Sequence, residues 1–489
     1  LEEKLAATTT SSGTRNKLVT TVAVVMSVYT ILFVSRVFDN LNIFIPQVAH
    51  NSLFLAFLLT LCFLSLPVRK SERREDVPWY DFLIILLAIA GPVYNFFTWK
   101  GNAERYTLMD YHPFEIGFAF TTIIAVLEVT RRALGLAMPL VAVLFLLHML
   151  FGSHLSGALH VRPVTLLDLA SAFVYYDTGI YGIALAVAAT LIFMFILFSQ
   201  FMFACGAGDI MMGLAISLFG HVRGGPAKVS VVASGLMGMM SGSTTANIAS
   251  TGVFTIPMMK RIGYRPEFAG AVETVASNGG QVMPPVMGLV AFVIAQWLGI
   301  RYWTICLVSF IPAFLYYIAV FIMIDAEAAR LGLRGMPRSE GPPLFDTLKK
   351  AWIFLLPLLV LMLFLGVLMY PPEMSVLYAL GSMLLLSLLR WAAGLQKRER
   401  ITAQTAAQNA WKIGLETLKG GSVGMLMPGV ACACAGIIIG ALSVTQIGLV
   451  LSHIAVALAG ENQLLLLALG AFACLILGMG MSSLPAYIL

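Results

Sequence analysis

The sequence predicts an all-α polytopic membrane protein, and three observations carry that prediction. Hydrophobic residues make up 59% of the 489 residues and charged residues only 11%, whereas about a quarter of a soluble domain is charged. The apolar runs are continuous and about 20 residues long, which is the length that crosses a bilayer as a helix. They do not alternate over about ten residues, as strands of a membrane β-barrel do. An ordinary soluble fold is therefore excluded.

The placement of the basic residues indicates a membrane topology, and the placement of the cysteines gives no sign of a cofactor site. The net charge of +6 does not indicate a nucleic-acid partner, because basic residues gather in short loops between apolar runs. The basic loop 69–74 is placed in the cytoplasm, which puts loops 38–50 and 98–113 outside. The six cysteines lie in apolar runs without a CxxC pair, so we expect inert thiols, no cofactor and no metal beyond coupling ions.

The apolar spans are predicted in order along the chain. They lie at 17–37, 51–68, 79–97, 114–131, 134–152, 179–205, 302–324, 351–369, 374–392 and 422–444. The first four spans form an N-terminal four-helix membrane module, residues 1–132, and residues 133–489 form a second module. Residues 208–225 are short and end with His221 and Arg223, so we expect an interfacial helix there.

The stretch 230–288 organises the second module. Its first part, about 229–258, is bracketed by basic residues at both ends, which predicts a re-entrant hairpin with SGSTTAN, 241–247, at its tip. Its second part, about 268–298, is a crossing helix broken at SNGGQVMPP, 277–285. Backbone that breaks its helix at membrane depth lines a cavity or is buried in protein, so a binding site is predicted here.

An internal repeat appears when the chain is shifted by about 240 residues. The shift aligns Gly208 with Gly448, Gly220 with Gly460, Gly238 with Gly478, Ser243 with Ser483 and Ala246 with Ala486. An odd number of crossings separates the copies, so the second is inverted and its hairpin enters from outside. Inverted repeats with broken helices are typical of secondary transporters. We expect that the return of the second hairpin, the second broken helix and a final span are missing from this chain.

The tips and breaks supply the oxygens that a sodium ion needs. The predicted sodium ligands are Ser241, Gly242, Ser243, Thr244, Asn247, Ser277, Asn278, Gly279, Gly280, Gly478, Ser482 and Ser483. Half-helix N-termini at the breaks favour an anion such as a carboxylate. The predicted substrate residues are Ser243, Asn278, Pro284, Pro285, Ser483 and Pro485. The alternative for each hydroxyl is a bond to the preceding turn or a neighbouring helix.

Glu273 lies in the apolar run just before the predicted break. A carboxylate inside a membrane segment is a functional candidate by default, so an ion-coupling role is predicted. The alternative places Glu273 near the cytoplasmic interface, paired with Arg261 or Arg265.

The segment 220–288, from GHVRGG to PPVMG, resembles the large membrane subunit of tripartite ATP-independent periplasmic (TRAP) transporters. AVETVASNGGQ, PPVMG and a fused small subunit at 1–132 are similar to the TAXI branch. The resemblance implies a sodium-driven elevator-type importer whose sodium sites carry onto Ser241, Gly242, Ser243 and 277–280. It also implies a periplasmic TAXI-type binding protein that delivers a small organic anion. The second hairpin departs from the family's usual GMGLPTTAAYI, because this chain has GMGMSSLPAYI.

The sequence thus predicts a multi-pass inner-membrane permease, monomeric among membrane lipids, with no nucleic-acid partner and no covalent chemistry. One alternative is a binding-protein-independent divalent-anion symporter driven by sodium or protons. A second is a membrane-embedded lipid-modifying enzyme, although no HExxH, P-loop or paired intramembrane carboxylates favour it. The substrate is not identified by the sequence.

Overall fold

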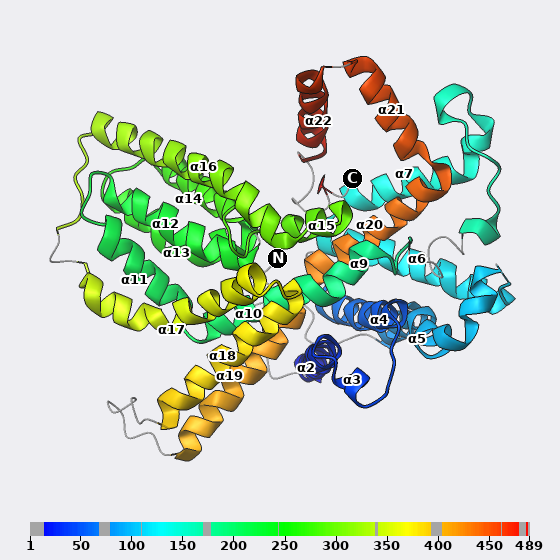
Figure 1. The fold of residues 1–489 in the computed structure, drawn as a ribbon, viewed down its shortest axis with the longest axis horizontal. Coiled ribbons are helices and arrows are strands. Elements are labelled where there is room, and N and C mark those ends of the chain that lie inside the picture. Colours follow the sequence, from blue (N-terminus) through cyan, green and yellow to red (C-terminus); the bar gives the residue numbers. More distant parts are fainter. Residues whose placement is uncertain are drawn as a thin grey trace. The chain divides into compact units, whose positions relative to one another are not determined.

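The computed structural model describes residues 14–67, 79–108, 110–169, 178–242, 244–337, 341–392, 403–460, 462–478 and 486–487, and every regular element in these ranges is helical (Figure 1). Eight helices in this part of the chain are long and apolar enough to cross a membrane. They are Arg15–Val34, Gln47–Ser65, Asp81–Thr107, Pro113–Leu134, Ala137–His154, Ile183–Ala204, Tyr302–Arg330 and Trp411–Thr445. The predicted all-helical fold with long apolar spans is confirmed.

The chain divides into two compact units, and the stretch that organises the sequence lies wholly in unit 1. Among the described residues, unit 1 covers 191–421 and unit 2 covers 14–190 and 422–487. The helices of unit 2 are α2 (Thr14–Val34), α3 (Val37–Asn40), α4 (Gln47–Ser65), α5 (Trp79–Thr107), α6 (Pro113–Leu134), α7 (Ala137–Phe151), α9 (Ile183–Val187), α20 (Leu426–Thr445), α21 (Ile447–Ala459) and α22 (Gln463–Gly478). Within unit 2, α20 packs on α4, α6, α7 and α9, so the two parts of the chain share one core.

Unit 1 is built around the hairpin and the broken helix. Its helices are α10 (Phe193–Ala204), α11 (Ala207–Phe219), α12 (Gly225–Ser241), α13 (Thr244–Arg261), α14 (Pro266–Gly280), α15 (Leu289–Leu298), α16 (Tyr302–Arg330), α17 (Leu344–Met362), α18 (Pro372–Ala392) and α19 (Ala403–Gly424), whose last residues pass into unit 2. The two arms α12 and α13 lie against each other, and α14 packs on both. The helix α16 covers α12 and α14.

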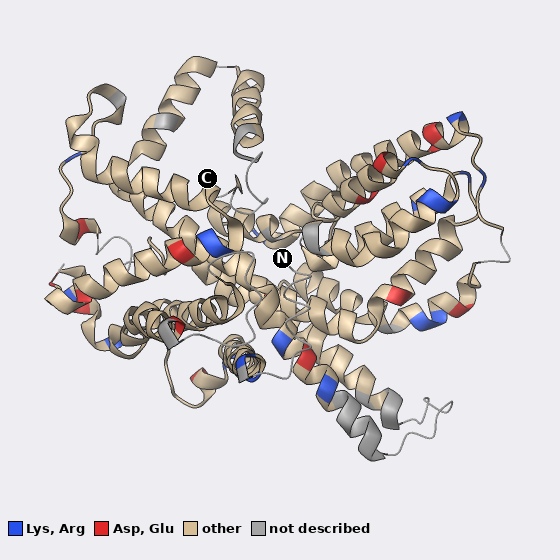
Figure 2. Ribbon diagram, turned by 180° about the vertical axis from the view of Figure 1, so that it is seen from behind, with Lys and Arg blue, Asp and Glu red and all other residues tan. Residues whose placement is uncertain are grey.

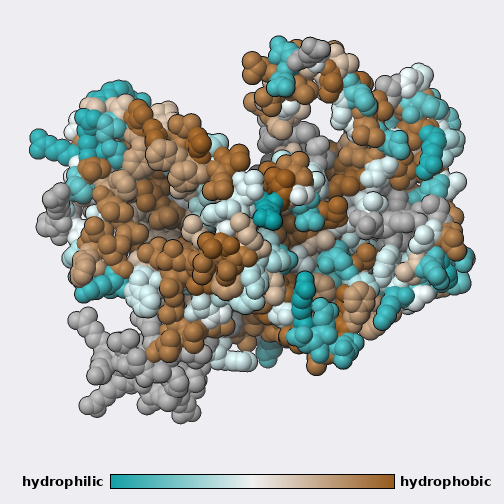
Figure 3. Space-filling model, viewed as in Figure 1, coloured by the Kyte–Doolittle hydropathy of each residue, from teal (hydrophilic) through white to brown (hydrophobic). Residues whose placement is uncertain are grey.

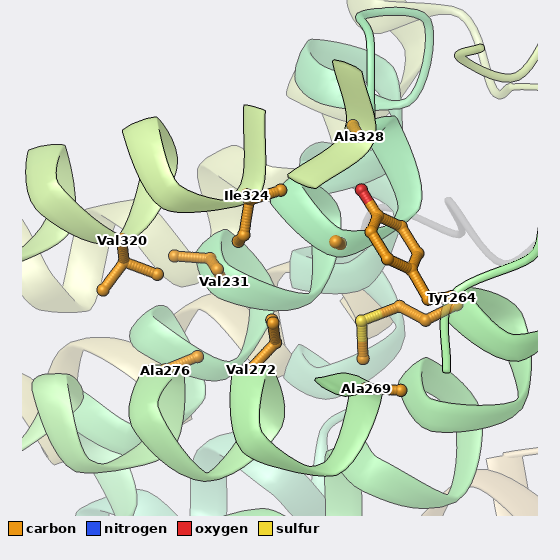
Figure 4. Packing of buried hydrophobic residues seen from close by; sticks show 10 residues of the cluster. Val231, Tyr264, Ala269, Val272, Ala276, Val320, Ile324 and Ala328 are labelled. Atoms are coloured by element: carbon orange, nitrogen blue, oxygen red, sulfur yellow. The ribbon is translucent and has the colours of Figure 1, made fainter. Parts of the chain in front are cut away.

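The apolar core of unit 1 lies between α12, α14 and α16 (Figure 4). Val320, Ile324 and Ala328 recur every four residues along α16 and face this core, so one stripe of the helix is buried. Other faces of α16 expose large apolar side chains such as Phe310 and Phe314, and Figure 3 shows apolar residues over this helix. A helix that is apolar on all sides fits a position between protein and lipid.

Charged residues avoid the middle parts of most helices. In Figure 2 the Lys, Arg, Asp and Glu segments of unit 1 lie mainly near helix ends. Asp325, near the C-terminal end of α16, pairs with Arg223 and, at 2.7 Å, with Lys228 at the start of α12. This arrangement suits helices whose central parts lie in a bilayer.

The structure corrects some predicted spans and agrees with others. The span predicted at 351–369 is not one straight helix, because α17 begins at Leu344 and bends by 55° before a π-helical turn at Leu363–Val367. The span predicted at 374–392 corresponds closely to α18, which runs from Pro372 to Ala392. The predicted interfacial helix at 208–225 ends earlier than expected, since α11 stops at Phe219 and Gly225 already begins α12.

The helix bounds repeat at the offset found in the sequence. The helices α11 and α21 are both 13 residues long. The first residue of α21 lies 240 residues after the first residue of α11, and the same is true of their last residues. Each follows an apolar helix, α10 or α20, and precedes a longer helix, α12 or α22. The inversion of the second copy stays a prediction.

Candidate functional site

The predicted tip is a tight turn between two helices. The arm α12 ends at Ser241, and Gly242 follows with φ of +63°, a left-handed conformation that an L side chain rarely adopts. The Gly242 N–H donates to the carbonyl oxygen of Gly238 at 3.0 Å, which closes the end of α12. The second arm, α13, begins at Thr244. The hairpin predicted at 229–258 is therefore present as two antiparallel helices.

Glycines let the backbone of the broken helix touch the hairpin. A Cβ added to Gly280 of α14 would lie 2.8 Å from backbone atoms of Gly238 of α12. A Cβ on Gly238 would lie 3.0 Å from Asn247 Nδ2 and from the carbonyl oxygen of Ser277. Such contacts are closer than side chains allow, and small residues are the usual means of close approach between membrane helices. The tip and the break are thus held in direct contact.

Asn247 joins all three helices at this contact. It lies on α13 with 1% of its surface exposed, and its Nδ2 donates to the Ser234 carbonyl at 2.7 Å and to Ser277 Oγ at 3.0 Å. The Ser234 carbonyl can only accept, so the amide nitrogen must face it. Asn247 Oδ1 then points away from that carbonyl, and this buried oxygen has no hydrogen-bond partner among the described atoms.

The more exposed predicted residues form the rim of the same site. Gln281 Nε2 donates to Thr244 Oγ1 at 2.7 Å, and Thr244 Oγ1 lies 3.4 Å from Asn278 Oδ1. These contacts connect the start of α13 with the end of α14. The residues Ser241, Gly242, Thr244, Asn247, Ser277, Asn278, Gly279 and Gly280 therefore come together in unit 1. Ser243, Ser482, Ser483 and Pro485 lie outside the described residues, and Gly478 ends α22 in unit 2.

The break itself differs from the prediction in where it starts. SNGG, 277–280, is still helical and forms the last turn of α14, so the break covers only 281–288 before α15 begins. Pro284 and Pro285 lie in this break and are joined by a cis peptide bond. The Tyr302 hydroxyl of α16 donates to the carbonyl oxygen of Val286. One helix thus fixes the position of the opened backbone.

Glu273 is fully buried and surrounded by hydroxyl groups. Oε2 accepts from Ser230 and Thr255, each at 2.6 Å, while Oε1 accepts from Ser234 at 2.6 Å and from Thr251. Two of these donors lie on α12 and two on α13.

The alternative that Glu273 pairs with Arg261 or Arg265 is wrong, and its depth in the membrane stays untested. Glu273 forms no ion pair within the described ranges, and none of its surface is exposed. Its environment is a cage of neutral donors inside the hairpin.

Sequence reasoning missed the hydroxyl groups of this cage and the role of Tyr302. A pattern was available for the cage, because each helix places two polar residues four positions apart on its buried face. These pairs are Ser230 and Ser234, Thr251 and Thr255, and Glu273 and Ser277.

The fold and the site define a polytopic helical membrane protein in which a hairpin packs against a broken helix, as in secondary transporters. Residues 121–489 match the family described as the tripartite ATP-independent periplasmic transporter, DctM component. Because the match covers more than half of the chain, the chain belongs to this family. It is a multi-pass permease of the bacterial inner membrane and not an enzyme.

Individual relatives match over shorter segments. A sialic acid TRAP transporter large permease protein of Vibrio cholerae is 29% identical over 33% of this chain and 38% of its own length. C4-dicarboxylate TRAP transporter large permease proteins of Pseudomonas aeruginosa and Vibrio cholerae are 28% and 29% identical, over 34% and 38% of this chain and 39% and 41% of their own lengths. The matched part therefore spans about two fifths of the length of these relatives.

Proposed function

We propose that this chain is the membrane component of a sodium-driven importer that receives a small organic anion from a periplasmic binding protein. Family membership supports the use of a binding protein, which favours this function over the binding-protein-independent symporter. The relatives are named for sialic acid and C4-dicarboxylates, which are both carboxylic acids, so a carboxylate is the proposed substrate class. The segment before residue 121 is proposed to be a fused small subunit, and the binding protein to be of the TAXI type.

The single observation that carries the sodium proposal is the side-chain oxygen of Asn247, Oδ1, which is buried and has no hydrogen-bond partner among the described atoms. A buried amide oxygen without a partner costs about 1–3 kcal/mol, and a ligand that accepts its lone pair removes that cost. The hydroxyl of Thr244, the amide of Asn278 and the last carbonyls of α14 lie at the same tip and offer further oxygens. Sodium binding there would fix the hairpin against α14 before the anion binds.

The proposed substrate position follows from the same contact. The N-terminal end of α13 meets the end of α14 through Thr244, Gln281 and Asn278. Free N–H groups at a helix N-terminus attract a carboxylate, and the rim residues supply hydrogen bonds that fix its orientation. An ordered tip would therefore favour anion binding. In this way sodium binding would promote binding of the substrate anion. In the elevator movement that we propose, the hairpin and broken helix would carry both across together.

The test of this function is a cation-dependent stability measurement followed by uptake. The purified permease is heated in sodium, potassium or choline chloride at equal ionic strength. Sodium at a hundredfold excess over its dissociation constant should stabilise it by about 2.7 kcal/mol. Asn247→Ala should lose the sodium-specific part, whereas Thr274→Ala, which removes an exposed hydroxyl on α14, should keep it. Equal stability of the wild-type protein in all three salts would contradict the sodium proposal.

Uptake is then measured in proteoliposomes with a periplasmic binding protein from the same organism. Labelled C4-dicarboxylates and sialic acid are the probes, with an inward sodium gradient. Uptake should require both the gradient and the binding protein. Sodium-driven uptake that is equally fast without a binding protein would instead favour the divalent-anion symporter.

A further inference from the structure

A second group of buried polar side chains lies in unit 2, where α4, α5 and α6 pack on one another (Figure 1). Ser52 of α4, Asn95 of α5 and Thr122 of α6 have none of their surface exposed. Tyr181, which precedes α9, has 1% of its surface exposed. All four side chains are neutral, and none of them lies in the hairpin or in the broken helix.

The polar ends of these side chains converge on one place. Asn95 Nδ2 donates to Ser52 Oγ at 2.8 Å, and the hydroxyls of Ser52 and Thr122 lie beside the Tyr181 hydroxyl. A Cβ added to Gly91 would lie 2.6 Å from Thr122 Oγ1. Gly91 lies one turn before Asn95, so the same face of α5 lies directly against α6.

Two atoms of this group lack a partner. Asn95 Oδ1 and the Tyr181 hydroxyl are buried and form no hydrogen bond with any described atom. Burying a polar group without a hydrogen bond is unfavourable, and nearly all buried polar groups in folded proteins are paired. Polar groups that lie close together without a direct bond are commonly connected by a bridging water. The pair therefore indicates a bound molecule that completes the hydrogen bonds of both atoms.

The backbone at Tyr181 is held in position by two helices. The buried Asn51 Nδ2 of α4 donates to the carbonyl oxygen of Tyr181 at 2.7 Å. Gly436 of α20 packs on the preceding residues, since a Cβ added to it would lie 2.6 Å from the Gly179 carbonyl oxygen and 2.8 Å from Ile180 Cα. Because both contacts oppose movement of the main chain, the hydroxyl is not free to shift toward a direct partner.

The hydrogen bonds that remain open fit one water molecule. Asn95 Oδ1 can only accept, whereas the Tyr181 hydroxyl has a hydrogen to donate. The Ser52 and Thr122 hydroxyls already donate to carbonyl oxygens of their own helices, at 2.8 and 2.7 Å, so they offer only lone pairs. A water that accepts from Tyr181 and donates to Asn95 Oδ1 and to one of these hydroxyls makes three hydrogen bonds, which is about the usual number for a buried water.

A metal cation fits this group less well than a water does. A cation binds oxygen lone pairs and gives the Tyr181 hydrogen no acceptor. The group contains no carboxylate, and Glu115, which lies two turns before Thr122 on α6, pairs with Arg105 at 2.9 Å. Burying a charge without a counter-charge is far more costly than burying a neutral molecule.

We propose that one water molecule binds between Asn95 Oδ1 and the Tyr181 hydroxyl and joins two parts of the chain. Ser52 and Asn95 precede the residues that match the DctM family. Thr122 and Tyr181 lie within the matching residues. The water thus completes a buried polar junction that fastens the segment before residue 121 to the rest of the permease. The bond from Asn51 to the Tyr181 carbonyl crosses the same junction.

The sign of one stability change tests the water. In Tyr181→Phe the melting temperature of the purified permease should fall, because the water loses one of its hydrogen bonds. Tyr94→Phe, which removes a direct bond of 2.7 Å to Glu115 in the same unit, is the control and should also lower it. Removing a hydroxyl that has no partner at all relieves its desolvation cost. A melting temperature of Tyr181→Phe equal to or above that of the wild type would therefore overturn the proposal.

A double-mutant cycle tests the bridge between the two unpartnered atoms. Asn95→Leu and Tyr181→Phe remove bonds to the same water, so their combined loss of stability should be smaller than the sum of the single losses. Tyr302→Phe, in unit 1, shares no partner with Tyr181, so the losses of that pair should add. Additive losses for Asn95→Leu with Tyr181→Phe would overturn the bridge.

A cryo-EM map of the full chain in lipid nanodiscs, at a resolution that shows ordered waters, identifies the molecule directly. A density about 2.7–3.2 Å from Asn95 Oδ1 and from the Tyr181 hydroxyl is expected in sodium chloride and in choline chloride alike. A density present only in sodium chloride would replace the water by a cation, and no density in either salt would overturn the site. None of these outcomes depends on sodium-driven uptake, so failure of the junction and failure of the proposed function are distinguishable.

Discussion

The contact between Gly280 and Gly238 makes a quantitative prediction about the packing of the hairpin. In Gly280→Ala the new Cβ would meet the backbone of Gly238 at 2.8 Å, and ordinary contact begins at 3.4 Å. The atoms must therefore separate by about 0.6 Å, and neither side can give way by rotating a side chain. Because backbone must move on both helices, we expect a cost of about 1–3 kcal/mol, the usual range for overpacking a core.

Gly270→Ala is the matched control for this change. It lies on the same helix, α14, and an added Cβ there would meet nothing within 4 Å. Removing a glycine from an open helical position should stabilise the protein by about 0.5–1 kcal/mol. Both variants are compared by SDS-induced unfolding in mixed micelles, under conditions where refolding is reversible. The difference between them should therefore be about 1.5–4 kcal/mol.

The substitution should also affect ligand binding through the tip. A separation of α14 from α12 moves Ser277 away from Asn247, so Gly280→Ala should bind sodium more weakly than Gly270→Ala does. Equal unfolding free energies of the two variants would refute the argument that backbone contact at these glycines fixes the hairpin. A loss of stability with unchanged sodium affinity would refute the link between that contact and the site.

Three further substitutions test other contacts. Tyr302→Phe removes the hydroxyl bond to the Val286 carbonyl at the break and should cost about 1–2 kcal/mol in unfolding free energy, and no loss would contradict a role in holding the break. Asp325→Asn breaks two ion pairs of a partly exposed carboxylate, so the melting temperature should fall only slightly and the difference should shrink in high salt. Glu115→Ala removes a buried carboxylate that lies 2.9 Å from Arg105 in unit 2, and a loss of about 3 kcal/mol is expected. A smaller loss of stability for Glu115→Ala than for Asp325→Asn would show that burial does not determine which of these ion pairs contributes more to stability.

The sequence predicted the hairpin turn and the break of unit 1 because composition changes sharply at both places. Gly242 within SGSTTAN marks a turn that few other residues could make, and Pro284 with Pro285 marks a break that backbone without N–H groups favours. The exact start of the break was not predictable in the same way. Gly279 and Gly280 are poor helix formers, but close packing against α12 and α16 keeps them helical. Tertiary packing therefore overrode local propensity.

The environment of Glu273 shows which part of a site the sequence alone does not give. A lone carboxylate in an apolar run suggested either ion coupling or a salt bridge with a nearby arginine. Which of these two environments Glu273 has depends on which face of α14 packs against the hairpin. The packing of three helices, α12, α13 and α14, determines that face. Ser234 and Thr255 lie 39 and 18 residues away from Glu273 in the chain, so their roles follow only from the packing.

Close packing and polar chemistry at this site depend on each other. The glycines at 238 and 280 bring two backbones together, and Glu273 and Asn247 are buried between the same three helices. Buried polar groups must then be satisfied by neighbouring helices, and the hydroxyl pairs on α12 and α13 do this for Glu273. Asn247 Oδ1 has no hydrogen-bond partner among the described atoms. Any ligand that binds this oxygen therefore also strengthens the contact between the hairpin and the broken helix. Ligand binding and rigidity of the tip are therefore expected to change together, and a variant that loosens the glycine contact should weaken both.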